Sequence, residues 1–151
     1  MERTMTAGRS PAQALAALVG AVFILVGIAG FIPGITTHLY GGLDFAGHNS
    51  DAKLLHIFQV SWLHNFVHIG FGLVGLALAS TWAGARAYLI GGGVVYLVLW
   101  LYGLLISMDG GANFVPLNTA DNWLHFGLGV GMIGLGFATT RDHRAVKSPA
   151  V

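Results

Sequence analysis

The sequence predicts an all-α integral membrane protein, a bundle of four transmembrane helices built as two duplicated helical hairpins with both termini in the cytoplasm. Three observations predict this class. Hydrophobic residues make up 55% of the 151 residues and charged residues only 9%, with a mean hydropathy of +0.72, whereas a soluble domain has about 25% charged residues. Four long stretches contain no Asp, Glu, Lys or Arg. The few positive charges fall almost entirely on one side of these stretches.

The composition also excludes several classes of function. The chain has no cysteine, which excludes disulfides, iron–sulfur clusters, thiolate chemistry and covalently attached haem. Its net charge of +1 offers no basic patch, so nucleic acid is not expected as a partner. The expected environment is the lipid bilayer.

The four predicted spans are apolar stretches close to the length that a bilayer requires. A hydrocarbon core about 30 Å thick needs about 20 apolar residues in a helix. The first stretch is longer than the apolar region of about 7–15 residues in a signal peptide, so we interpret it as a retained span. The domain organisation is then a cytoplasmic segment 1–12, a transmembrane domain 13–140 and a cytoplasmic tail 141–151. The spans are Ala14–Ile35, Leu54–Ala85, Ala87–Met108 and Asn122–Thr140.

The orientation follows from the positive charges, which favour the cytoplasmic side of a membrane. With four spans, only Lys53 lies on the opposite side from the other Lys and Arg residues. The connections Thr36–Lys53 and Asp109–Asp121 are therefore predicted to face outward. The residues predicted on the cytoplasmic side are Arg3, Arg9, Arg86 in the turn between spans two and three, Arg141, Arg144 and Lys147.

Residues that favour helix ends stand near the predicted span boundaries. Asp51 is expected to cap the helix that enters the second span, and Thr119 the fourth, with Asp121 in its first turn. Pro33 and Gly34 are expected to close the first span.

Two segments indicate an internal repeat. Trp62-Leu63-His64 and Trp123-Leu124-His125 match at an offset of 61 residues. Duplicated hairpins related by an axis along the membrane normal are an established membrane architecture. Small residues also recur along both helices and allow close helix packing, within the bundle or against a second copy. The glycines expected to serve this packing are Gly70, Gly75, Gly127 and Gly131, of which the last two form a GxxxG pair.

The histidines are the most informative polar residues. Six of the seven fall in the predicted outer half or the outer loops, namely His38, His48, His56, His64, His68 and His125. His64 and His68 are four residues apart and so share one helix face. The repeat places His125 at the depth of His64, so the three side chains are expected to approach one another.

Three interpretations of this histidine cluster stay open. In the first, the histidines hydrogen-bond across helices, and the protein is a non-enzymatic structural or interaction subunit, alone, as a homo-oligomer or in a larger membrane complex. In the second, His64, His68 and His125 bind a metal, zinc or copper, or ligate haem. The third, a proton or solute pathway, fits less well because the spans are continuous and their inner half is apolar. No set of nucleophile, base and orienting residue is found, so no catalytic residue and no enzymatic activity are predicted.

Four segments resemble a known bacterial family, the domain of unknown function 4383. The resemblance covers roughly Ala14 to Thr140 and implies four helices in the plasma membrane, as a multi-pass protein. The family is uncharacterised, so the resemblance implies no catalytic residues. The segments are Phe31–Thr37, Leu63–His68, Tyr88–Tyr96 and the long, distinctive Asn113–His125.

Overall fold

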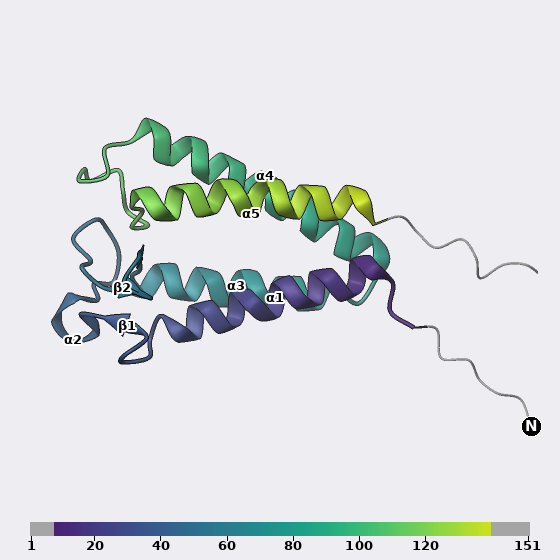
Figure 1. Ribbon diagram of the computed structural model, residues 1–151, viewed down its shortest axis with the longest axis horizontal. Helices are drawn as coiled ribbons and strands as arrows, with labels where there is room; N and C mark the ends of the chain where they lie inside the picture. The colour runs from purple at the N-terminus through teal and green to yellow at the C-terminus, as the bar shows by residue number, and fades with distance from the viewer. Residues whose placement is uncertain (1–7, 140–151) are drawn as a thin grey trace, which may run out of the picture.

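The computed structural model describes residues 8–139 and consists mainly of four long helices arranged as two hairpins (Figure 1). In the first hairpin, α1 (Pro11–Ala29) packs along α3 (Trp62–Leu78). In the second, α4 (Trp82–Leu105) packs along α5 (Thr119–Ala138). The hairpins meet mainly through α1 and α4. The predicted all-α class is confirmed.

Each long helix begins at a residue whose side chain accepts a backbone hydrogen bond from the first turn. These residues are Ser10, Ser61, Thr81 and Asn118, and such caps satisfy N–H groups that have no partner within the helix. Two predicted helix-capping residues were therefore wrong. Asp51 lies in a loop, ten residues before Ser61, and Thr119 is the first residue inside α5.

A loop region, which we call the cap, covers one end of the bundle and comprises residues 30–61 and 106–118. It contains the short helix α2 (Leu39–Gly42) and an antiparallel sheet of β1 (Thr36–Thr37), β2 (Lys53–Leu54) and β3 (Phe58–Gln59). The second predicted span therefore began too early. Its first residues form strands, and the helix begins only after Ser61.

The described ends of the chain lie at the opposite end of the bundle from the cap (Figure 1). The Gln13 side chain donates a hydrogen bond to the Ser80 carbonyl in the turn between α3 and α4. Arg86 Nε donates to the Gly136 carbonyl near the end of α5. Arg86 lies inside α4 rather than in the turn, because the helix begins at Trp82. The predictions for Arg3, Arg141, Arg144 and Lys147 lie outside the described residues.

Glycine contacts hold each hairpin together, and the same contacts occur in both. A Cβ atom added to Gly20 would lie 2.7 Å from the Gly72 carbonyl oxygen, and one added to Gly93 would lie 2.7 Å from that of Gly129. Helix backbones approach this closely only where side chains are absent. In the same way, Gly30 faces the Asn65 side chain and Gly103 faces that of Asn122.

These recurring contacts relate the hairpins at an offset of 73 residues for the first helix and 57 for the second. The ring contact between Phe23 and His68 recurs between Tyr96 and His125 at the same offsets. The structure therefore matches His125 with His68, whereas the offset of 61 matched it with His64. The two alignments differ by four residues, about one helical turn.

Large apolar side chains cover the outside of the bundle, with one example on each long helix: Leu25 is 65% exposed, Leu73 56%, Val98 58% and Val130 50%. Judged by length and composition alone, α1 and α4 are able to cross a membrane, and α3 is a shorter apolar helix of 17 residues. An exposed apolar belt of this kind is rare on soluble monomers.

Candidate functional site

Three of the histidines lie around one cavity directly beneath the cap, which we call the chamber. Its volume is about 110 Å³, and its titratable lining residues are His64, His68, Asp121 and His125. The remaining lining is apolar and comes from α1, the cap and α5. His64 and His125 are 4% and 5% exposed. All three histidines line this one cavity, and their joint binding of a ligand stays a prediction.

Aromatic contacts surround the histidine rings, and the His64 ring also donates a hydrogen bond to the backbone of Pro116 and Gln59. The ring centroids of His64 and His68 are 4.5 Å apart. His68 stacks on Phe23, and His125 meets Tyr96 edge to face at 5.1 Å. The Nδ1 atoms of all three histidines are buried without a hydrogen-bond partner among the described residues. Buried polar atoms normally have a partner, so these nitrogens are suited to a ligand or to water.

Asp121 connects the chamber to the cap. Its carboxylate accepts hydrogen bonds from the backbone N–H groups of Gln59, at 2.9 Å, and Asn118, at 3.0 Å. The Asn118 side chain in turn donates to the Ile57 carbonyl. Sequence analysis placed Asp121 in the first turn of a helix but did not predict its bond to Gln59, because the two residues are 62 positions apart.

Further hydrogen bonds hold strand β3 over the chamber. Ser50 Oγ donates to the Val60 carbonyl, and Gln59 Nε2 donates to the carbonyl of Ser50. The adjoining turn contains Leu55 and His56 at φ values of 51° and 63°. Residues other than glycine rarely adopt this left-handed backbone region, so the turn stores strain at the rim of the chamber.

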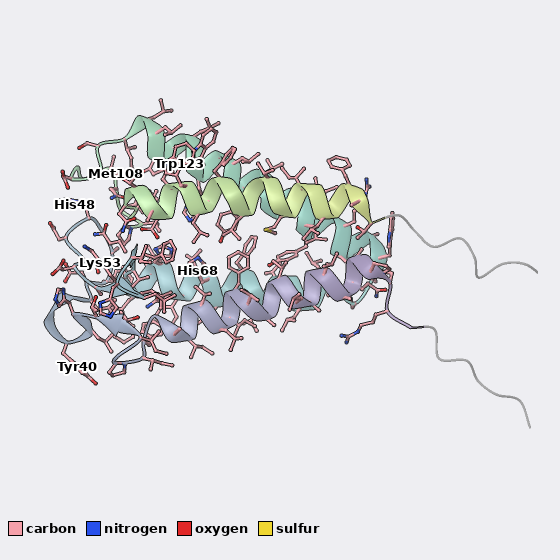
Figure 2. All side chains as sticks on the ribbon, in the orientation of Figure 1. Tyr40, His48, Lys53, His68, Met108 and Trp123 are labelled. Atoms are coloured by element: carbon pink, nitrogen blue, oxygen red, sulfur yellow. The ribbon has the colours of Figure 1, made fainter. Side chains whose placement is uncertain are left out.

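A second cavity, which we call the groove, runs between α1 and α5 and has a volume of about 390 Å³. Apart from His68, its lining side chains are apolar. The groove and the chamber share His68, Val26, Leu124 and Leu128. Figure 2 shows His68 on the side of the first hairpin that faces the second. None of the residues lining either cavity is Lys or Arg.

The four glycines expected to pack helices differ in their surroundings. A Cβ atom on Gly75 would meet the Tyr88 ring. A Cβ atom on Gly70, Gly127 or Gly131 would meet nothing within 4 Å. Gly127 and Gly131 line the groove. Packing inside the chain therefore involves Gly75, and packing against a second copy stays a prediction for the others.

The other predicted histidines lie in the cap. His38 Nδ1 lies 2.8 Å from a carboxylate oxygen of Asp51 at the exposed surface. His48 lies in the cap (Figure 2), and its backbone carbonyl accepts a hydrogen bond from the Gln59 side chain. Within residues 8–139, no group of three or more His, Asp or Glu residues is arranged to hold a metal ion. The chamber thus offers imidazole nitrogens and one buried carboxyl group in an apolar surrounding.

The chain was compared with known proteins. No curated protein and no solved structure matched it. A family model described as "Domain of unknown function (DUF4383)" matches residues 13–138, which include all four long helices except the first two residues of α1. The chain therefore belongs to the DUF4383 family.

Proposed function

We propose that the protein is a non-enzymatic structural or interaction subunit that crosses the bacterial plasma membrane four times, with both termini in the cytoplasm. The observation that carries this proposal is the belt of exposed apolar side chains on all four long helices. In water such a belt would favour aggregation, whereas in lipid it is the expected surface. The cap then faces outward and covers the polar chamber.

Site-specific photo-crosslinking in native membranes tests the interaction role. A photoreactive residue replaces Leu25, Leu73, Val98 or Val130 in turn, so that each long helix is probed once on its exposed face. We expect a discrete adduct, a second copy or a partner protein, from one helix face and none from the opposite face. If none of the four positions yields an adduct heavier than the single chain, the protein functions as a lone bundle and the interaction role is wrong.

A further inference from the structure

We propose that the groove and the chamber form one binding site for an uncharged, single-tailed membrane amphiphile with a carbonyl-bearing ring, an isoprenoid quinone. The ring would occupy the chamber beside His64, His68 and His125, and the tail would lie along the groove. This inference rests on the proposed membrane location, and it adds a ligand to that proposal.

The two cavities adjoin, because they share four lining residues, and they differ in chemical character. They meet at His68, Val26, Leu124 and Leu128. On one side of this junction are the buried histidines, and on the other are only apolar side chains. A ligand that fills both cavities must therefore be polar at one end and apolar along the rest.

The chamber favours a neutral ring that accepts hydrogen bonds. A neutral imidazole carries one N–H donor. His64 uses its donor on the backbone of Pro116 and Gln59, whereas the buried Nδ1 atoms of His68 and His125 have no partner among the described residues. The lining contains the acidic Asp121 but no Lys or Arg, so a carboxylate or phosphate head group lacks a counter-charge there. The chamber volume of about 110 Å³ is smaller than the volume of about 150 Å³ of an engineered cavity that binds benzene, so the ring would extend past His68 into the groove.

The groove favours one extended tail that enters from the lipid. On α1 it runs from Val26 to Leu18, which at a rise of about 1.5 Å per residue is roughly 12 Å. Leu18 is 60% exposed at the far end of the groove, so a longer tail would continue into the bilayer. Gly127 and Gly131 leave the α5 wall of the groove without side chains at these two positions.

Two seams lie between the hairpins, one between α3 and α4 and the other between α1 and α5. Only the α1–α5 seam contains the groove. At the α3–α4 seam, the rings of Phe71 and Tyr88 pack with centroids 5.0 Å apart. The contact offsets of 57 and 73 relate these residues to Leu128 and Leu15 at the α1–α5 seam. Two leucines fill less volume than two aromatic rings, and no short turn holds α1 against α5. The groove therefore stays open at this seam.

The test is the binding of decylubiquinone to the purified full chain in detergent, followed through the melting temperature by size-exclusion chromatography of heated samples. The key variant is Gly131→Leu, whose side chain enters the groove, and its matched control is Gly134→Leu. Both glycines lie on α5 with nothing within 4 Å of an added Cβ atom, but only Gly131 lines the groove. Both substitutions also change helix propensity equally.

We expect decylubiquinone to raise the melting temperature of the wild type and of Gly134→Leu, because a ligand that binds only the folded state stabilises it. Gly131→Leu should lose this rise. His68→Phe should bind about tenfold more weakly through loss of one hydrogen bond, whereas His48→Phe in the cap should bind normally.

Three results would overturn the proposal: no rise in the wild type, an equal rise in both glycine variants, or a larger rise with palmitate, which would indicate an anionic ligand. A change in oligomeric state in Gly131→Leu without any loss of quinone binding would assign the groove to a second copy instead. These outcomes are independent of the crosslinking result, which tests the membrane subunit itself.

Discussion

Asp121 shows how a single residue joins segments that are distant in the sequence. Its carboxylate closes the first turn of α5 by accepting the Asn118 N–H, and it also accepts the N–H of Gln59 in strand β3. It is 2% exposed, so the carboxylate itself is shielded from water. Without this acceptor, two partly buried N–H groups would lose their partner, which costs more than a hydrogen bond contributes.

We therefore expect Asp121→Ala to lower the free energy of unfolding by about 2 kcal/mol. Thermal or SDS-induced unfolding of the detergent-solubilised protein measures this. Asp109→Ala is the matched control, because Asp109 is an exposed aspartate of the cap, and it should change stability by less than about 0.5 kcal/mol. Equal losses in the two variants would contradict the assigned role of Asp121.

At the scale of the helices, each hairpin is held by glycines at which two backbones touch. Gly20 meets Gly72 between α1 and α3, and Gly93 meets Gly129 between α4 and α5. A Cβ atom added to Gly20 or to Gly93 would lie 2.7 Å from a carbonyl oxygen of the partner helix. Backbone atoms cannot rotate away as a side chain can, so an added methyl group must push the helices apart.

Gly20→Ala and Gly93→Ala should each lower the free energy of unfolding by about 1–3 kcal/mol, and by similar amounts because their contacts correspond. Gly91→Ala, two residues from Gly93 in α4 but with nothing within 4 Å of its added Cβ atom, should have no such cost. Melting temperatures of the three variants check this. A loss in only one hairpin would show that the two contacts are not equivalent.

The helices also show how far sequence reasoning reaches. The apolar stretches located all four long helices, because an unbroken run without charges is a local feature. The start of α3 was misplaced because Leu54–Val60 is as apolar as the helix that follows. Only the pairing of β2 with β1 and β3 makes that run a pair of strands.

At the scale of the whole molecule, the charged residues are distributed unequally between the two ends of the bundle. Lys53 and the aspartates Asp44, Asp51 and Asp109 lie in the cap, whereas Arg9 and Arg86 lie towards the other end, near the α3–α4 turn. Cytoplasmic loops of membrane proteins carry an excess of Lys and Arg. The cap is therefore expected outside the cell.

Cysteine labelling tests this orientation, since the chain has no native cysteine. His48→Cys places a thiol in the cap, and Ser80→Cys places one in the turn between α3 and α4. A membrane-impermeant maleimide should label the first in intact cells and the second only after permeabilisation. Both should react in detergent. Labelling of Ser80→Cys alone in intact cells would reverse the proposed orientation.

The sequence by itself determined the helical class, the positions of the apolar segments, the family and the shared face of His64 and His68. All of these depend on composition, on motifs or on residues within one turn of each other, so local patterns are sufficient. The tertiary structure decided that His125 corresponds to His68, that Asp121 binds Gln59 and that the α1–α5 seam stays open. These features depend on side-chain volumes and hydrogen bonds between residues more than fifty positions apart, whose partners are set only when the hairpins pack.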